Sequence, residues 1–378
     1  NDAALHIKSA IDAVSADYSV QAHFGKRWFS NIIRNLPQAE QLLPALPPIH
    51  SAAICAAGPS LDDTLPLLQE KKNRPFIIAV DTSLPSLLGA GLEPDAVVSI
   101  DCQHISYYHF MAGLPEHTLL FLDLASPPLV ASRSARPYFF SGGHPLTRYL
   151  SRYWRPIPEL DTSGANVTYA ALSLAEYLGA RTIELYGADF SYPKGVSYAR
   201  GSYIRALFEN RQTRNNPLEN LHSAFLYRTP LSRRSGEGGS WRYETKAMTM
   251  YRKRLEEKAR SIAARVSAAA GAPSPMALEN RSAPASDSAP RRIFASGRAS
   301  MGAAEFLRGY REGIAALPAL TGPALPCLES FSREESIIFT TLLPSMAAIK
   351  RRVPELSIPE AAQATCDFSV EAISKVIG

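Results

Sequence analysis

The sequence predicts an α/β protein built on a doubly wound, mostly parallel sheet, with helical segments at both ends. Two observations lead to this prediction. Short, continuous apolar runs recur between residues 51 and 186, and continuous apolarity is typical of strands that are buried on both faces of a parallel sheet. The stretches between these runs have helical patterns, as an alternating strand–helix order requires.

The N-terminal segment, residues 1–48, is predicted to be a helical lead-in. Apolar residues recur at helical spacing from Leu5 to Leu36, and such spacing indicates an amphipathic helix. A Pro-rich stretch at 43–48 ends the pattern, because proline cannot continue a helix.

Residues 49–266 are predicted to form one open, Rossmann-like α/β domain. Its expected strands are Ser51–Ala56, Phe76–Val80, Ala96–Ile100, Leu119–Leu122 and Thr182–Tyr186. Helical patterns over 64–69, 84–88 and 165–178 lie between or beside these runs. In such a domain a ligand binds at the carboxyl ends of the strands.

Beyond the last of these strands the chain is first basic, then low in complexity, then helical. Residues 205–254 contain far more Lys and Arg than Glu, and the Gly-rich stretch 235–240 within them predicts a flexible loop. A helix is expected over about 243–270. An Ala/Pro/Ser-rich linker is expected at 267–300 and a helical region at 301–378.

The composition excludes several classes of protein. The chain has 378 residues, of which 46% are hydrophobic and 20% charged, as in ordinary globular proteins. No apolar run approaches the roughly 18 residues of a membrane span. The net charge of +5 suits an anionic ligand without indicating a nucleic-acid partner. The four cysteines are scattered, which favours reduced thiols in the cytoplasm over a zinc module.

The turn Gly58-Pro59-Ser60 after the first strand is a candidate ligand site. Here a glycine lets the backbone approach a phosphate, and the next helix begins with free N–H groups that attract anions. The turn lacks the glycines of a dinucleotide fingerprint and the lysine of a Walker A loop. A plain strand-to-helix turn explains it equally well.

Three aspartates, Asp81, Asp101 and Asp189, directly follow predicted strands. Carboxylates in this position can accept hydrogen bonds from a ribose or bind Mg²⁺. Helix capping is the alternative for each one, but three in equivalent places favour a ligand site. A second turn, Thr162-Ser163-Gly164, precedes a helix and can either hold a phosphate or carboxylate or serve as an ordinary cap.

The order of these motifs resembles the MptE-like family, which includes the motility-associated factor (Maf) glycosyltransferases that modify flagellin. The resemblance covers about residues 20–260 and rests on Gly58–Leu61, Ala79–Asp81, Pro94–Asp101, Thr162–Gly164 and Leu185–Phe190. It implies a glycosyltransferase that moves a nonulosonic, sialic-acid-like sugar from a nucleotide-activated donor to Ser or Thr of flagellin.

More remotely, the motif order is similar to that of bacterial sialyltransferases, which use a CMP-activated sugar. This similarity implies a sialyltransferase-like fold and a nucleotide site formed by Gly58, Pro59, Ser60, Asp81, Thr82, Asp101, Thr162, Ser163, Gly164, Asp189, Tyr192 and Tyr198. Asp81 and Asp101 stand where that family carries Asn. Their charge would be unfavourable beside a phosphate unless a cation such as Mg²⁺ joins them or they face sugar hydroxyls.

Two further features follow from the same similarity. The sialyltransferases place a catalytic His before the helix that follows their lid, and this chain has none there. His222 and Glu244 are therefore the candidate bases. The basic residues 200–242 fall where the related enzymes carry a lid, so they are expected to close over the nucleotide-sugar.

Three functions remain open at this point. The first is the glycosyltransferase, with flagellin or another protein acceptor and a nucleotide-sugar as partners. The second is a Mg²⁺-dependent enzyme like 6-hydroxymethylpterin pyrophosphokinase, which the three aspartates favour. The third is a non-catalytic protein that binds flagellar partners. Amphipathic helices at both ends favour the first.

Overall fold

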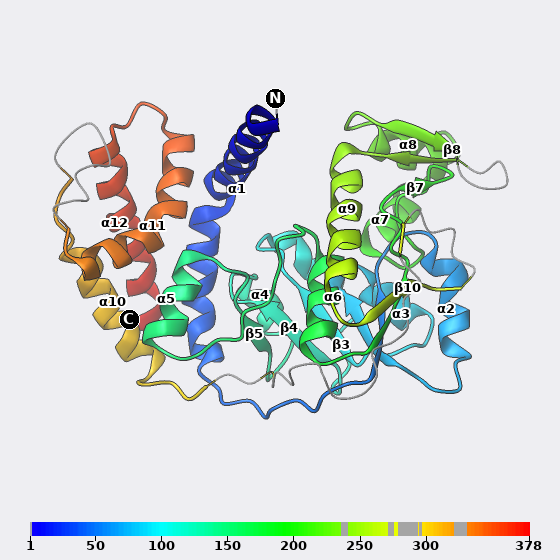
Figure 1. Ribbon diagram of the computed structural model, residues 1–378, viewed down its shortest axis with the longest axis horizontal. Coiled ribbons are helices and arrows are strands. Elements are labelled where there is room, and N and C mark those ends of the chain that lie inside the picture. Colours follow the sequence, from blue (N-terminus) through cyan, green and yellow to red (C-terminus); the bar gives the residue numbers. More distant parts are fainter. Residues whose placement is uncertain (1, 236–240, 271–275, 279–293, 295–296, 321–330) are drawn as a thin grey trace.

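The computed structural model describes residues 2–235, 241–270, 276–278, 294, 297–320 and 331–378. These residues form a seven-stranded sheet of order β10-β6-β1-β2-β3-β4-β5, in which every neighbouring pair is parallel (Figure 1). The strands are β1 (Ser51–Cys55), β2 (Phe76–Val80), β3 (Ala96–Ser99), β4 (Leu119–Asp123), β5 (Tyr138–Phe140), β6 (Thr182–Tyr186) and β10 (Arg265–Ala268). The prediction of a doubly wound α/β fold is confirmed.

The strand order reverses beside β1. From β1 the chain builds β2 to β5 outward in one direction, and it then returns to place β6 and β10 on the other side of β1. In open parallel sheets such a reversal leaves a crevice at the carboxyl ends of the strands, where ligands bind. The reversal here lies between β1 and β6.

Helices cover both faces of the sheet, and β1 shows how. Ala53 and Cys55 of β1 pack toward α1 (Asp2–Ala39), α2 (Leu61–Gln69), α3 (Leu84–Gly89) and α4 (Pro128–Ala131). Ala52 and Ile54 point the other way, toward α6 (Val167–Tyr177) and α9 (Lys246–Ser261). Because both faces are buried, the strand is apolar throughout, which is why its sequence shows no alternation.

Two elements differ from the sequence-based expectation. The helix expected over about 243–270 is α9, which ends at Ser261, and the chain then forms β10, whose Arg265 lies opposite Thr182 of β6. The expected linker at 267–300 therefore begins inside a strand. Most of its remaining residues lie outside the described part of the chain. The short strand β5 was also not predicted.

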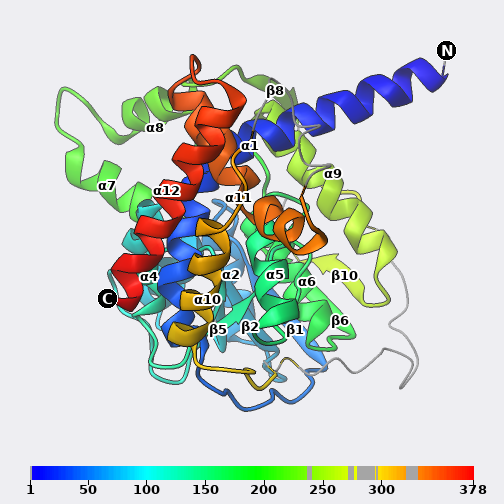
Figure 2. The same ribbon diagram turned by 90° about the vertical axis from the view of Figure 1, so that its left-hand side faces the viewer.

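The helical flanks are confirmed, and they pack together. Helices α10 (Ala303–Ala315), α11 (Arg333–Arg352) and α12 (Ile358–Ile377) gather along α1 (Figure 2). Gly25 makes the closest approach, since a Cβ atom built on it would lie 1.8 Å from the Pro344 carbonyl oxygen of α11. Among the described helices, none combines the length and the apolarity that crossing a bilayer requires.

Three amide side chains of α1 bind the loops that follow β3 and β4. We call Asn31, Asn35 and Gln38 the amide ladder. Asn31 and Asn35 are nearly inaccessible to solvent, and each Nδ2 donates to two backbone carbonyls over 2.8–3.0 Å. The acceptors of the ladder are Cys102, Leu124, Ala125, Ser126, Ala131 and Ser134. The ladder thereby ties α1 to the carboxyl edge of the sheet.

The basic segment 200–242 is largely helix and strand. It contains α7 (Tyr203–Arg211), α8 (Leu218–Leu226) and β8 (Ser232–Ser235). With β7 (Tyr192–Pro193) and β9 (Trp241–Glu244), β8 forms an antiparallel sheet of order β7-β9-β8. Of the loop expected at 235–240, residues 236–240 lie outside the described part of the chain. The role of the segment as a lid stays a prediction.

Candidate functional site

Asp81 is the first polar group at the carboxyl edge, directly after β2. Its side chain is buried, and its two oxygens accept from three groups. The Ser99 hydroxyl donates to Oδ2 over 2.6 Å, and the Thr82 N–H and hydroxyl donate to Oδ1 over 2.7 and 3.0 Å. Thr82, predicted to bind nucleotide, therefore orients Asp81.

Asp101 lies near Asp81, in the loop after β3. The Gln103 N–H donates to its Oδ1 over 2.8 Å. Burial raises the pKa of Asp101, and the neighbouring charge of Asp81 raises this pKa further. Within the described residues, no group of three or more His, Cys, Asp and Glu side chains is arranged to hold a metal ion. A Mg²⁺ ion at these two aspartates would take its other ligands from water or substrate.

The Gly58 turn differs from the anion site that the sequence predicts. The Ser60 N–H at the start of α2 donates to Asp189 Oδ2 over 2.8 Å, so a carboxylate of the protein itself already occupies the helix N-terminus. Asp62 and Asp63 add negative charge in the first turn. A further anion is unfavourable here.

Gly58 has a packing role in this turn. Its N–H donates to the Gly187 carbonyl over 2.9 Å, and a Cβ atom on Gly58 would lie 2.4 Å from both that carbonyl oxygen and Asp189 Oδ2. A side chain does not fit at this position, because the loop after β6 lies directly against it. Pro59 only continues the turn, and its carbonyl accepts from the Asp62 N–H. Burial raises the pKa of Asp189.

The Thr162-Ser163-Gly164 turn, in contrast, lies beside positive charge. Arg254 of α9 donates from Nη1 to the Ser163 carbonyl over 2.9 Å. Lys258, one turn further along α9, lies 3.3 Å from Asp161 at the base of the same turn. The Ser163 N–H also donates to Asp161 Oδ1 over 3.0 Å, and Lys258 is paired with Glu176 over 2.8 Å. Arg254 is therefore the cation that makes this turn, of the two singled out in the sequence, the better candidate for a phosphate.

The same turn is held against two neighbours. Gly164 allows the ring of Tyr169 to lie beneath it, because a Cβ atom would be 2.1 Å from that ring. The Thr162 hydroxyl donates to the Gly142 carbonyl over 3.3 Å. Gly142 follows β5, so this contact places the turn next to the ends of β4 and β5.

Tyr192 and Tyr198 precede α7 and pack against α8. Both rings contact Phe225 of α8, with centroids 6.4 and 6.0 Å away. Burial raises the pKa of Tyr198 to about 12, and the charges of Tyr192 and Asp81 contribute. Near neutral pH both phenols therefore stay protonated and can donate hydrogen bonds to a bound ligand.

The two predicted bases are buried and have polar partners within the protein. His222 is buried in α8, its Nδ1 lies 3.0 Å from the Ser197 hydroxyl, and burial lowers its pKa. Glu244 is buried in β9, where it accepts from Arg242 Nε over 2.9 Å and lies 3.7 Å from Arg252. Both environments favour structural roles.

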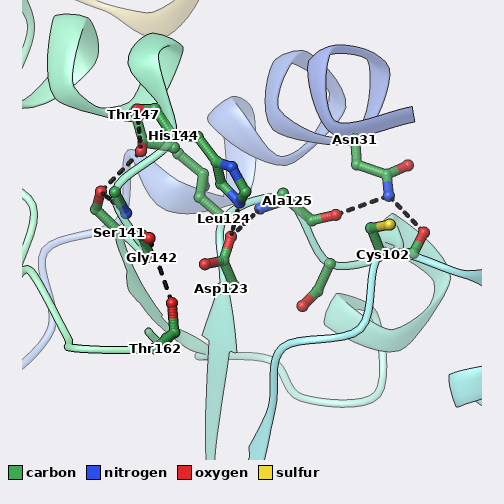
Figure 3. A network of polar contacts seen from close by, with 12 residues as sticks. Asn31, Cys102, Asp123, Leu124, Ala125, Ser141, Gly142, His144, Thr147 and Thr162 are labelled. Carbon is green, nitrogen blue, oxygen red and sulfur yellow. Dashed lines mark hydrogen bonds and ion pairs between the residues drawn. The ribbon is translucent and has the colours of Figure 1, made fainter. Parts of the chain in front are cut away.

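An Asp–His pair that the sequence analysis did not single out lies at the ends of β4 and β5. Asp123 is the last residue of β4, and His144 immediately precedes α5 (Pro145–Tyr153). His144 Nε2 lies 3.6 Å from Asp123 Oδ1, which also accepts from the Ala125 N–H over 2.7 Å (Figure 3). The ring of Trp28, from α1, lies 4.4 Å from the imidazole.

Comparison with known proteins shows that the chain around this edge matches a family model. Residues 26–195 match the family model described as 6-hydroxymethylpterin diphosphokinase MptE-like. We call this segment the MptE-like domain, after the family model that it matches. It contains the strand-end aspartates, the Asp123–His144 pair and both turns. Tyr198, the α7–α8 insert and α9 lie beyond it.

Similar proteins are known from sequence and structure. An uncharacterized protein of Treponema pallidum (strain Nichols) is 32% identical over 153 residues, which cover 39% of this chain and 54% of that protein. A second one is 42% identical over 109 residues, 28% of this chain and 52% of that protein. The chain thus spans about half the length of these relatives.

Among solved structures, a Maf glycosyltransferase from Magnetospirillum magneticum AMB-1 is similar to this chain. The TM-score is 0.50 at 14% sequence identity, over 93% of this chain and 54% of the other. At this identity the likeness shows a shared fold, which extends beyond the MptE-like domain to the helical flanks.

The raised pKa of Asp101 predicts that the stability of the protein depends on pH. Asp101→Asn is expected to raise the melting temperature relative to wild type, and by more at pH 7.5 than at pH 4.5. Since the folded-state pKa of Asp101 is raised, its contribution to stability is complete below the unfolded value of about 3.9 and is lost as the pH rises through the folded value. Asparagine does not ionise and avoids this loss.

Thermal unfolding of both proteins at several pH values between 4.5 and 7.5 measures the difference. A difference in melting temperature that is constant, or that shrinks as the pH rises, would contradict the assigned environment of Asp101.

Proposed function

We propose that this chain transfers a sugar from a nucleotide-activated donor to a hydroxyl group of an acceptor. The observation that carries the proposal is the pairing of two kinds of group at one sheet edge. Two carboxylates, which are suitable acceptors for sugar hydroxyls, follow β2 and β3, at Asp81 and Asp101. The turn Thr162-Ser163-Gly164, beside Arg254, suits a phosphate and contacts Gly142 just after β5. A nucleotide-sugar carries both hydroxyls and phosphate.

The finer assignment rests on the family and on the edge chemistry. We propose a nonulosonic sugar carried by CMP as the donor, and Ser or Thr of flagellin or another protein as the acceptor. The protonated phenols of Tyr192 and Tyr198 would donate to phosphate oxygens. The helical flanks, which lie outside the sheet, would contact a protein acceptor. The shared fold with a Maf glycosyltransferase supports this proposal.

A ligand screen tests it. Thermal shift and isothermal titration with CMP, UDP, GDP and ATP, each with and without Mg²⁺, should show that CMP stabilises the protein and the others do so less. Stabilisation by ATP with Mg²⁺ alone would contradict the glycosyltransferase. It would favour a pterin pyrophosphokinase instead, the second candidate, which the family description and the neighbouring carboxylates of Asp81 and Asp101 support.

Arg254 gives a sharper prediction. Arg254→Ala should weaken nucleotide binding by about tenfold to a hundredfold, because hydrogen bonds to a charged partner contribute about 1.5–3 kcal/mol. The loss of affinity with added salt should also become less steep, since one cation no longer contacts the phosphate. Titration at several salt concentrations measures both effects.

Lys253 provides the matched control. It is the preceding residue of α9 and is exposed, so Lys253→Ala removes the same charge from the same helix at a point where no contact with the turn is seen. If both variants bind nucleotide alike, the phosphate does not lie beside Arg254.

A further inference from the structure

The Asp123–His144 pair has the geometry of a proton acceptor and the group that orients it. We propose that His144 is the general base of the transfer reaction and that Asp123 positions it; this inference rests on the proposed function. In the transfer step the oxygen of the acceptor hydroxyl bonds to the anomeric carbon of the sugar, and His144 takes the proton of that hydroxyl. The bond from that carbon to the phosphate oxygen breaks, and the nucleotide leaves with the bonding electrons.

The position of Asp123 is well defined. Its side chain is buried, at 3% exposure, and Oδ1 is held by the Ala125 N–H. A Cβ atom on Gly142 would lie 2.2 Å from Asp123 Oδ2, so the chain after β5 closes over the carboxylate. The loop after β4 is itself fixed by Asn31, which donates to the Ala125 carbonyl (Figure 3).

This geometry selects one nitrogen of His144 as the base. Nε2 faces Asp123, so a neutral imidazole that carries its hydrogen on Nε2 leaves the lone pair on Nδ1. Within the described residues Nδ1 has no hydrogen-bond partner, and the side chain is 20% exposed. The Trp28 ring packs against the imidazole and restricts its rotation. His144 can therefore receive a proton from a bound group.

Asp123 is the charged group that faces His144. Burial raises the pKa of Asp123, and the charge of His144 is the largest effect in the opposite direction. A proton on His144 thus converts a buried lone carboxylate into an ion pair. Of the neighbouring elements, α1 contributes the uncharged Trp28, and Arg148 of α5 is paired with Glu159 over 3.5 Å.

The pair lies next to the proposed phosphate position. The Thr162 hydroxyl donates to the Gly142 carbonyl, and a Cβ atom on Gly142 would lie 3.0 Å from that hydroxyl oxygen as well as against Asp123. The turn that suits the phosphate and the carboxylate that orients His144 therefore lie on two sides of one residue.

The test compares His144→Gln with His50→Gln. His50 is an exposed histidine that precedes β1, at the opposite edge of the sheet. His144→Gln should lower kcat for transfer or for donor hydrolysis by about 10²- to 10⁴-fold, the usual contribution of a general base, and leave nucleotide affinity within about twofold. His50→Gln should behave as wild type. Imidazole in solution should partly restore the rate of His144→Ala, because the pocket it vacates is open to solvent.

The orienting role of Asp123 needs a separate measurement. Asp123→Asn should lower kcat and leave KM for the donor nearly unchanged, because the amide orients the imidazole less firmly without touching the donor. If Asp123→Asn does not fold, the His144 variants decide the matter alone.

The outcomes separate this inference from the proposed function. A wild-type protein that binds none of the nucleotides ends both. Normal nucleotide binding with an unchanged kcat in His144→Gln ends the base assignment and leaves the proposed function standing. Equal loss of kcat and of nucleotide binding in His144→Gln would make His144 a binding residue and also overturn its role as base.

Discussion

Gly58→Val is expected to prevent folding, not merely nucleotide binding. Its first added atom would lie 2.4 Å from the Gly187 carbonyl oxygen and from Asp189 Oδ2. The first is a backbone atom, and the second belongs to a buried side chain that the Ser60 N–H holds in place. Relief requires that β1 and the loop after β6 separate, which breaks the bond from the Ser60 N–H to Asp189. Overpacking in a well-packed interior typically costs about 1–3 kcal/mol or more, and here the backbone must also move.

Circular dichroism and thermal unfolding check this expectation, with Gly89→Val as the matched control. Gly89 is the last residue of α3, and a Cβ atom on it meets nothing within 4 Å. The control should fold and melt close to wild type, whereas Gly58→Val should be insoluble or melt far lower. A native melting temperature for Gly58→Val combined with lost nucleotide affinity would return this turn to the role of a phosphate loop.

Gly25→Ala is expected to loosen the whole C-terminal flank. The added methyl group would lie 1.8 Å from the Pro344 carbonyl oxygen and 2.2 Å from its carbon, so α1 and α11 cannot keep their spacing. The hydrogen bond from the Ser345 hydroxyl to the Gly25 carbonyl would be lost with it. We expect a loss of several kcal/mol in the free energy of unfolding, at the upper end of what overpacking costs.

The same substitution at Gly309 is the control. Gly309 lies inside α10, and a Cβ atom there meets nothing within 4 Å. Alanine should stabilise that helix by up to about 1 kcal/mol because it has the higher helix propensity. Thermal unfolding and limited proteolysis of α10–α12 compare the two variants. Equal melting temperatures would show that α1 and α11 are not packed as tightly as described.

The sequence predicted the central strands because both of their faces are buried, and this leaves a continuous apolar run. It could not predict β5, which has three residues, or β10, which follows a helical pattern without a break. The sequence also could not predict that α11 packs on α1. That contact depends on the shapes of Gly25 and Pro344, which lie at opposite ends of the chain, and no local pattern links them.

The site was predicted in part. Asp81 and Asp101 were identified as candidates because each directly follows a predicted strand. The structure places them near each other. The same rule applies to Asp123, which directly follows the run Leu119–Leu122 and could have been found by it. The charge around Ser60 could not be foreseen, because Asp189 lies 129 residues away. His144 could not be identified from the sequence, because its candidate role depends on contacts with Asp123 and Trp28, which lie on two other elements.

The amide ladder of α1 has a consequence for how this protein can be divided. Carbonyl groups after β3 and β4 receive their hydrogen bonds from Asn31 and Asn35, both encoded upstream of the first strand. A fragment starting at residue 49 would leave these carbonyls without donors and release two loops, the one that carries Asp101 and the one that directly follows Asp123. Truncation at the Pro-rich break would therefore leave a sheet whose strands still pair. The loops at its carboxyl edge would no longer have a fixed conformation.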